Sequence, residues 1–564
     1  MLPAPARHIL TTREMRRIEA EAHADGHTYE TMMRLAGAAV ARAVARRANR
    51  GVVVALCGPG NNGGDALVAA GLLRGAGYDA RVALCRRDGL GGPPEVAEQL
   101  EQAPCLVVDG SEGATLLRAW LAEADVWIDG LLGTGLARPI EGPLATVLRA
   151  LAEARARRPG SLLVAVDVPS GLDADSGALD PLAVPADLTV TFGFPKHGQL
   201  RMPGASAVGE LVLDDIGLGP ERFAGDAAMV TPDWVRSLLP ARPADGHKGT
   251  FGRLLVVAGS VTYTGAAYLA AAAAYRAGCG LVTAAVPASV RPVLAGLLPE
   301  ATFLVLPEDL GVIARGAAPL VRQAWLASDA LLVGPGLTTQ RPAAEFLADL
   351  LGRQSTAHRH GMGFAAPAAT AGDRGGDAGP DEGPAPRAVV DADALNLLAE
   401  GTTTGNAPPA LSDLPAHCVL TPHPGEMARL TGRTADSIQS DRLAAARDAA
   451  REWGHVVVLK GALTVVAAPD GRTAVNPCAL PALASAGTGD VLAGLIGGLL
   501  AQRLDAFEAA VVAVFVHGLA GRMAAEAVGA RATTASDVLA FAGRALELVD
   551  RGDTEDRWRV RHPA

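Results

Sequence analysis

The chain is organised around the stretch SAGTGDVLAGLIGGLL at residues 485–500. Its first two glycines, Gly487 and Gly489, allow a tight turn, and the amides that follow can open a helix toward an anion. Asp490 stands at the start of that helix, where a carboxylate is both favoured and exposed. The run at 491–500 is small and apolar on every face, which predicts a buried helix packed closely on a sheet. The stretch is a candidate phosphate cradle beside a base, with an ordinary helix cap by Asp490 as the alternative.

Three apolar strands before this stretch end in chemically useful side chains. They offer acids at 388–396, a His/Glu pair at 418–426 and a Lys-Gly turn at 456–464. Because the carboxyl ends of parallel strands meet at one edge of a sheet, we expect these groups to lie beside the 485–490 turn. The inventory suits a nucleotide with Mg²⁺ and the activation of a hydroxyl. Glycine amides would take the phosphates, Glu426 would face the metal or its waters, and Asp490 would act as base.

Composition narrows the possible partners. A chain of 564 residues is too long for one core, and about half apolar with a fifth charged is a globular composition. The formal net charge of -10 is spread without long runs of one sign, which argues against a nucleic-acid or anionic-membrane partner. A small-molecule ligand is the better expectation.

Cysteine usage and apolar stretches bear on the compartment. The six cysteines are scattered and form no C-x-x-C pair, which indicates a reducing compartment. Residues 1–17 lack the apolar core of a secretory signal. The longest apolar stretches, at 264–275 and 491–500, fall short of the roughly 20 residues that a membrane span needs. We therefore expect a cytoplasmic protein.

The N-terminal half begins with a helical pattern that runs from residue 11 through Val40. An apolar strand at 51–57 then ends in GPGNNGGD at 58–65, and a second helical pattern follows. Strand, glycine-rich turn and helix present bare backbone amides to a phosphate. The turn is neither a Walker loop nor a G-x-G-x-x-G fingerprint. Its asparagines and aspartate suit a hydroxyl-bearing ligand or a hard cation, with a plain connection as the alternative.

Two more strands of this half deliver similar clusters. The strand at 126–129 runs into DGLLGTGL at 129–136, and the strand at 161–166 runs into DVPSGLD at 167–173. Three such loops at one edge of an open parallel sheet are typical of a ligand site. Asp167 is the candidate that moves a proton, with a turn-capping role as the alternative. Lys196 either supplies a positive charge to the ligand or lies in solvent.

These loops, together with TFGFPK at 191–196, resemble the NAD(P)HX epimerase family over approximately residues 8–218. The resemblance implies a Rossmann-like three-layer fold and interconversion of the two C6 epimers of hydrated NADH and NADPH, called NADHX and NADPHX. It places Asp167 beside the reacting ring, and potassium on Asn62, Asp129 and Ser170. The residues that would hold the substrate are Asn61, Asn62, Gly63, Gly64, Asp65, Gly133, Thr134, Gly135, Leu136, Ala137, Arg138, Pro139 and Asp167.

The C-terminal segments TPHPGE at 421–426, KGALT at 460–464 and the 476–490 stretch resemble the ribokinase-like superfamily. They are more closely similar to its ADP/ATP-dependent NAD(P)HX dehydratases, over roughly residues 240–548. The resemblance implies that the hydrated nicotinamide nucleotide contacts Ala266, Gly336, His423 and Asp490. It implies that the adenine nucleotide is held by Lys460, Gly461, Ala462, Leu463, Thr464 and Gly489.

We therefore predict an α/β protein with two three-layer α/β/α domains. An epimerase domain at 1–218 and a linker at 219–245 precede a dehydratase domain at 246–550. A tract rich in Ala, Gly, Pro and Asp predicts a disordered insertion at 352–386.

The implied reaction is the repair of hydrated nicotinamide nucleotides. The first domain would interconvert R- and S-NAD(P)HX, and the second would dehydrate the S form at the expense of ADP or ATP. Phosphorylation turns a poor leaving group into a good one, with Asp490 removing the hydroxyl proton. We also expect K⁺ in the first domain, Mg²⁺ in the second and a homo-oligomer.

Two other functions stay open. A vitamin kinase of the hydroxymethylpyrimidine or hydroxyethylthiazole type uses the same Gly-x-Gly-Asp turn, and it leaves the phosphate esterified instead of free. A non-catalytic nucleotide sensor would bind without turnover, and Asp490→Asn would leave its function untouched.

Overall fold

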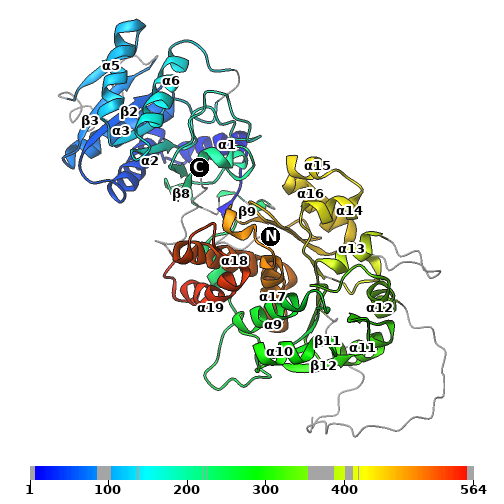
Figure 1. Cartoon of the computed structure of the whole chain (residues 1–564). Helices are drawn as coiled ribbons and strands as arrows, with labels where there is room; N and C mark the ends of the chain where they lie inside the picture. Colours follow the sequence, from blue (N-terminus) through cyan, green and yellow to red (C-terminus); the bar gives the residue numbers. More distant parts are fainter. Residues whose placement is uncertain are drawn as a thin grey trace, which may run out of the picture.

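The computed structural model describes residues 7–85, 103–135, 139–219, 222–223, 225, 227–352, 387–400, 411–416 and 418–554. Figure 1 shows two lobes, one built from the first part of the chain and one from the rest. Each lobe holds a largely parallel sheet between helical layers, so each is a three-layer α/β/α unit, as predicted. Apart from Gly352, the predicted insertion at 352–386 lies outside the described residues.

The first unit has a seven-stranded sheet, ordered β4-β3-β2-β5-β6-β7-β8, in which every neighbouring pair is parallel. Helices α1, α2 and α3 cover one face, and α5 and α6 cover the other. The strands are β2 (Val52–Cys57), β3 (Asp79–Leu84), β4 (Cys105–Val107), β5 (Val126–Gly130), β6 (Leu162–Val166), β7 (Leu188–Phe192) and β8 (Glu210–Asp214). The helices are α1 (Thr12–Ala24), α2 (Tyr29–Ala45), α3 (Asn61–Gly75), α5 (Gly110–Glu123), α6 (Gly142–Arg157) and α7 (Ala205–Val208).

The direction of strand addition reverses between β2 and β5. The chain first adds β3 and β4 on one side of β2, and then places β5, β6, β7 and β8 on the other. Such a switch point leaves a crevice at the carboxyl ends of the strands. The loops after β2, β5 and β6 therefore meet there.

The second unit has an eleven-stranded sheet, ordered β1-β9-β20-β19-β18-β17-β16-β15-β10-β11-β12. It is parallel from β12 to β18, and β19 and β20 add an antiparallel hairpin. Its strands are β1 (Arg7–His8), β9 (Ala227–Met229), β10 (Arg253–Val257), β11 (Leu281–Pro287), β12 (Thr302–Leu306), β15 (Ala330–Val333), β16 (Arg387–Val390), β17 (Val419–Leu420), β18 (Val456–Leu459), β19 (Val465–Ala467) and β20 (Thr473–Val475). A separate pair is formed by β13 (Glu308–Asp309) and β14 (Val312–Ile313).

The helices of this unit form two layers. Residues of α8, α9, α10, α17, α18 and α19 share a core on one face, and residues of α11, α12 and α13 share a core on the other. The helices are α8 (Pro232–Leu238), α9 (Thr264–Arg276), α10 (Arg291–Leu297), α11 (Ala318–Leu326), α12 (Arg341–Leu351), α13 (Asp393–Glu400), α14 (Pro424–Thr431), α15 (Ala435–Ser440), α16 (Arg442–Trp453), α17 (Thr488–Ala501), α18 (Ala506–Val528) and α19 (Ala535–Arg551).

Helix α17 is the buried helix that the 485–500 stretch predicts. A Cβ atom at Gly494 would stand 2.2 Å from the carbonyl oxygen of Ala270 in α9, and one at Gly498 would stand 2.7 Å from that of Ala274. Glycine is therefore needed for the two helices to approach this closely. The close packing fixes the direction in which the first turn of α17 meets the strand ends.

The helical pattern from residue 11 through Val40 is two helices and not one. Helix α1 ends at Ala24, Gly26 follows with a φ of +96°, and α2 begins at Tyr29. Thr28 caps the second helix by accepting a hydrogen bond from the amide of Thr31 at 3.2 Å. The positive φ and the new cap end one helix and start another.

The predicted linker at 219–245 is more than a connection. It contains β9, which pairs with both β1 and β20, and it contains α8. Trp234 and Val235 of α8 are buried in the core of the second unit. The sequence pattern did not indicate these elements, because the strand has only three residues and the helix only seven, and both lie among prolines and charged residues.

The expectation about apolar stretches was incomplete. Helix α18 has 23 residues and is apolar enough to cross a membrane by length and composition alone. In the most apolar window of that helix, 78% of the residues are buried inside the protein. It packs against α17, α19 and α8, as a core helix does.

The two units pack against each other. One hydrophobic cluster joins Val168 and Leu200 of the first unit to Met427 and Leu443 of the second. Strand β1 comes before every other described strand in the sequence, yet it pairs with β9 in the second sheet.

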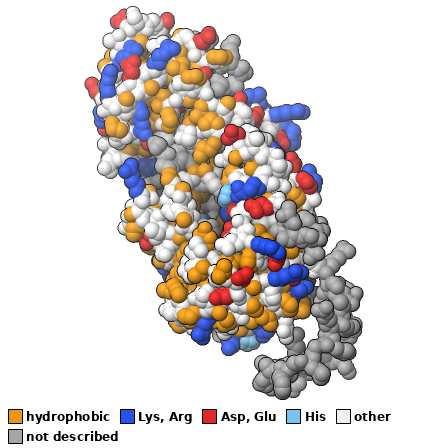
Figure 2. All heavy atoms as spheres, turned by 45° about the vertical axis from the view of Figure 1, so that its right-hand side comes forward, with side chains coloured by type: hydrophobic (Ala, Val, Ile, Leu, Met, Phe, Trp, Pro, Cys, Tyr) orange, Lys and Arg blue, Asp and Glu red, His pale blue; other side chains and the backbone are white. Residues whose placement is uncertain are grey.

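Figure 2 shows lysine, arginine and acidic side chains interspersed over the face that it draws.

Candidate functional site

The first cavity has a volume of 670 Å³ and is built at the switch point between β2 and β5. It is lined by the predicted residues Asn61, Asn62, Asp65, Gly133, Thr134, Gly135 and Asp167. Gly63 and Gly64 do not line it, and a Cβ at Gly63 would stand 2.0 Å from the carbonyl oxygen of Gly58. Pro139 is exposed and does not line it, and residues 136–138 lie outside the described residues.

The turn before α3 faces this cavity with its backbone. Pro59, Gly60 and Asn61 line the cavity, and Gly60 is the N-cap of α3 without a side-chain cap. The first amides of a helix have no partner within that helix and favour an anion. The structure therefore supports a phosphate contact at this turn.

Asp167 follows β6 directly and is held in a left-handed backbone conformation, with a φ of +63°. Its Oδ1 accepts a hydrogen bond from the ammonium of Lys196 at 2.5 Å and one from the hydroxyl of Thr191 at 3.0 Å. Lys196 is fully buried, and it is not the solvated lysine that the sequence left open. Gln199 donates to the carbonyl oxygen of Asp167 at 2.7 Å. The carboxylate is thus fixed at the cavity wall by a buried ion pair.

Glu19 of α1 lines the same cavity, and the sequence analysis missed it. Burial raises the pKa of its carboxyl, and the charge of Asp167 raises it further, while Lys196 acts in the opposite direction. A carboxyl with a raised pKa therefore shares the cavity with a carboxylate that is paired with an ammonium. One group can donate a proton and the other can accept one.

The predicted potassium ligands lie close together around the loop after β5, and Asn62 also lines this cavity. The hydroxyl of Ser170 donates to Asp129 at 2.6 Å, and the amide of Asn62 donates to the carbonyl oxygens of Val166 and Leu132 at 2.6 and 3.4 Å. Burial raises the pKa of Asp129, and no Lys or Arg of the described ranges forms an ion pair with it. A buried carboxylate surrounded by neutral oxygens fits a hard cation.

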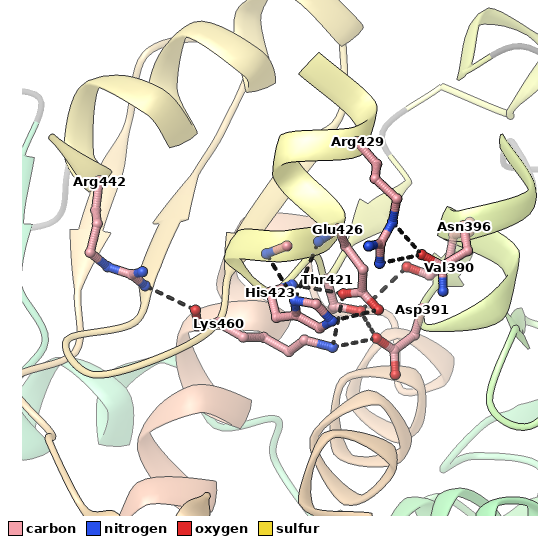
Figure 3. Close-up of polar contacts among 10 residues, drawn as sticks. Val390, Asp391, Asn396, Thr421, His423, Glu426, Arg429, Arg442 and Lys460 are labelled. Carbon is pink, nitrogen blue, oxygen red and sulfur yellow. Dashed lines mark hydrogen bonds and ion pairs between the residues drawn. The ribbon is translucent and has the colours of Figure 1, made fainter. Parts of the chain in front are cut away.

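The ends of β16, β17 and β18 gather a second polar cluster, which Figure 3 shows from the side. The ammonium of Lys460 lies 2.7 Å from Asp391 Oδ1 and 3.7 Å from Glu426 Oε2. Thr421 donates to the same Oδ1 at 2.6 Å. The other oxygen, Asp391 Oδ2, is buried without a hydrogen-bond partner among the residues that the structure describes. An uncompensated carboxylate oxygen of this kind fits a cation or its bound water.

His423 caps α14 and stays neutral. Its Nδ1 accepts hydrogen bonds from the amides of Gly425 and Glu426 at 3.0 and 3.3 Å. Burial lowers the pKa of the imidazole, and the charges of Lys460 and Arg429 lower it further. Because Nδ1 is an acceptor, the proton of the neutral ring is on Nε2, which can donate to a ligand.

The second cavity has a volume of 580 Å³ and lies between the Lys-Gly turn and the start of α17. It is lined by the predicted residues His423, Lys460, Gly461, Ala462, Thr464 and Gly489. Leu463 is buried in a hydrophobic cluster and does not line it. Gly487, the N-cap of α17, has a φ of +88° and offers no side-chain cap, so the first amides of α17 stay available to an anion.

Asp490 is half-buried in the first turn of α17. It does not line the second cavity, although the preceding residue, Gly489, does. Burial raises its pKa to about 7; Asp391 and Asp393 raise it as well, and Lys460 opposes them. A carboxylate with a pKa near neutrality is a much better base than an ordinary aspartate. The structure therefore gives Asp490 a basicity that the sequence alone did not show.

Ala266 and Gly336 do not line the second cavity. They lie beside each other, since a Cβ at Gly336 would stand 3.0 Å from that of Ala266. Two residues after Gly336, the amide of Thr338 donates to Asp393 at 2.8 Å. Asp393 is also one of the charges that raise the pKa of Asp490. The loop with Gly336 therefore contacts a carboxylate that influences Asp490.

Two further polar residues of the second cavity carry signals that sequence reasoning could have used. Asn476 and His517 line it, and Asn476 Oδ1 and His517 Nε2 are buried without a hydrogen-bond partner in the described part of the chain. His517 interrupts the apolar pattern of α18, which marks it as unusual in a core helix. Glu19 gave no such signal, because acids are common on an exposed helix face.

Both units of the chain are similar to known protein families. Residues 29–198 match the family model described as YjeF-related protein N-terminus, and residues 254–356 and 381–541 match NAD(P)H-hydrate dehydratase. A crystal structure of ADP/ATP-dependent NAD(P)H-hydrate dehydratase from Bacillus subtilis, co-crystallised with ATP/Mg²⁺, is 28% identical. It covers 58% of this chain and 100% of its own, with a TM-score of 0.43.

Full-length relatives are similar along both units. The bifunctional NAD(P)H-hydrate repair enzyme Nnr of Moorella thermoacetica is 39% identical over 526 residues, which are 90% of this chain and 91% of the relative. The Nnr protein of Escherichia coli is 32% identical over 545 residues, which are 93% of this chain and 92% of the relative. The chain therefore belongs to the family of bifunctional NAD(P)H-hydrate repair enzymes.

Proposed function

We propose that the two cavities perform the two steps of NAD(P)H-hydrate repair. The first cavity interconverts R- and S-NAD(P)HX, and the second dehydrates the S form with ADP or ATP as co-substrate. The observation that carries the proposal is Asp490, whose pKa is raised to about 7 in the first turn of α17. It does not itself line the 580 Å³ cavity, but it directly follows Gly489, which does. A base whose pKa lies near the working pH is well matched to removing a hydroxyl proton at neutral pH.

The second cavity would hold the adenine nucleotide by its phosphates. The amides at the start of α17 and the Lys-Gly turn at Lys460 face it, and Mg²⁺ bound with the phosphates would neutralise their charge. Asp391 and Glu426 are the carboxylates placed to hold that ion or its waters. Chemistry there is mainly a matter of positioning and charge, which suits rigid helix and strand ends.

Asp490 would take the proton of the C6 hydroxyl as that oxygen attacks the terminal phosphorus. The bond from that phosphorus to the leaving nucleotide oxygen breaks, and a lower nucleotide departs. The phosphate ester then leaves C6, the nicotinamide ring loses a proton, and NADH or NADPH and free phosphate result. His423, whose Nε2 is a donor, would bind an acceptor of the hydrated nucleotide.

The first cavity would epimerise by loss and re-addition of the C6 hydroxyl. Glu19 would protonate the departing oxygen, and Asp167 would remove a proton from the water that adds to the other face. Lys196 holds the Asp167 carboxylate in place through their buried ion pair. Potassium held by Asn62, Asp129 and Ser170 would order the loops after β5 and β6.

The test supplies a mixture of both epimers with ATP or ADP and Mg²⁺ and follows the absorbance of reduced nicotinamide. We expect complete recovery for the intact chain. Asp167→Asn should stop at about the share of the S epimer, and Asp490→Asn should lower the rate by about 10²–10⁴-fold. Full activity of Asp490→Asn would refute the proposed base. A nucleotide sensor instead predicts that the unmodified chain and Asp490→Asn both bind nucleotide and that neither forms reduced nicotinamide.

The fate of the phosphate separates dehydration from a vitamin kinase. Dehydration releases one free phosphate for each reduced nicotinamide formed, whereas a kinase leaves it esterified on its product.

Replacing K⁺ by tetramethylammonium in the same assay tests the cation of the first site. We expect a slower approach to complete recovery without a change in the dehydration of purified S epimer.

A further inference from the structure

We propose that the first unit completes the nucleotide site of the second, through Met202 and Ser206. Both residues line the 580 Å³ cavity, although they belong to the epimerase unit. This inference rests on the proposed binding of an adenine nucleotide in that cavity. It adds that the affinity for the nucleotide depends on a segment of another domain.

The segment that carries these residues packs against the second unit. Leu200, Ala205 and Val208 are buried in the hydrophobic cluster that also contains Leu443 and Leu463 of the second unit. Arg201 forms an ion pair with Asp441 at 3.3 Å. Met202 and Ser206 are held at the cavity by this packing, and they are not side chains of a free loop.

The start of α16, which contacts the first unit, also contacts the Lys-Gly turn at Lys460. Asp441, the partner of Arg201, caps α16 by accepting from the amide of Ala444 at 3.1 Å. Arg442, the next residue, donates to the carbonyl oxygens of Leu459 and Lys460 at 2.7 and 3.1 Å. The start of α16 therefore makes two contacts. Arg442 stabilises the Lys-Gly turn, and Asp441 forms the ion pair with the first unit.

The chemistry of the two side chains suits one edge of a nucleotide. Met202 is 43% exposed, so a ligand can still cover apolar surface on it. The hydroxyl of Ser206 donates to the carbonyl oxygen of Pro203 at 2.6 Å, and its oxygen can accept from a base amine or a ribose hydroxyl. The first unit thus contributes one apolar contact and one acceptor.

One short segment of the chain carries residues of both sites. Lys196, which pairs with the proposed proton acceptor Asp167, lies six residues before Met202 on the same short segment. One piece of chain therefore touches both sites.

Calorimetric titration of the intact chain with ADP and with ATP, each with Mg²⁺, tests the proposal. We expect Met202→Ala to weaken binding by about fourfold to tenfold, the loss of one or two methylene-sized contacts. Met202→Leu keeps the volume and should bind like the unmodified chain. Met202→Glu should weaken ATP more than ADP, with a difference that shrinks as salt is added, because the added charge repels phosphate.

The control is Leu326→Ala, which truncates a side chain that is 85% exposed at the end of α11, away from the cavity. It should bind both nucleotides as the unmodified chain does, and thermal unfolding should show that every variant is folded. If folded Met202→Ala and Met202→Glu bind as tightly as Leu326→Ala, the first unit does not complete the site. If the unmodified chain binds neither nucleotide, the proposed function itself fails.

Discussion

At the residue scale, the surroundings of Asp490 change its acid–base chemistry strongly. Its raised pKa of about 7 means that the base form appears only as pH rises through neutrality. We expect kcat for dehydration at saturating nucleotide to rise with pH through about 7. Asp393→Asn removes a negative charge that raises this pKa, so the rising limb should move to lower pH. A pH profile of kcat that is flat across neutrality, or unmoved in Asp393→Asn, would contradict the assignment.

The buried pair of Asp167 and Lys196 gives a second prediction at this scale. Asparagine tolerates the positive φ at position 167, so Asp167→Asn removes the charge and leaves the backbone conformation possible. It leaves the Lys196 ammonium buried without its partner, which should cost about 3–5 kcal/mol of unfolding free energy. The double variant Asp167→Asn, Lys196→Met should recover part of this loss in chemical denaturation. Strictly additive losses would mean that the two groups do not interact.

At the element scale, the fold depends on the approach of α17 to α9. Gly494→Ala would place a methyl group 2.2 Å from the carbonyl oxygen of Ala270, so the helices must move apart. We expect a loss of about 1–3 kcal/mol of unfolding free energy. Gly543→Ala in α19 is the control, because its nearest neighbour would be 3.7 Å away and alanine favours a helix by up to about 1 kcal/mol. Thermal unfolding that ranks the two variants the other way would disprove the packing argument.

At the scale of the whole molecule, the second unit is not complete within residues 246–550. A fragment that starts at residue 246 lacks β9 and α8, which leaves the edge of β20 unpaired and removes Trp234 from the core. We expect this fragment to aggregate, and a fragment that starts at residue 226 to stay monodisperse longer in size-exclusion chromatography. Equal thermal unfolding midpoints for the two fragments would show that the predicted boundary was adequate.

Sequence reasoning reached most of both sites because their residues stand in short local patterns. Asp167, Asp391 and the Lys-Gly turn each follow an apolar strand directly, Asp129 is the second-last residue of β5, and parallel strands deliver their ends to one edge. The roles assigned to these residues, including potassium binding, stay predictions. Leu463, Gly63 and Gly64 belong to the right segments, yet none of them lines either of the two cavities. Leu463 is buried in a hydrophobic cluster, and the two glycines are buried in the first turn of α3.

The two α/β units, the glycine-rich turns and the carboxylates at the strand ends follow from residues that are close together in the chain, so local patterns predict them. The basicity of Asp490, the burial of Lys196, the presence of Glu19 in the first cavity and the position of Met202 at the second became known from the folded chain alone. These properties come from burial and from contacts between residues that are far apart in the sequence. No local pattern records which distant groups will share a low-dielectric site.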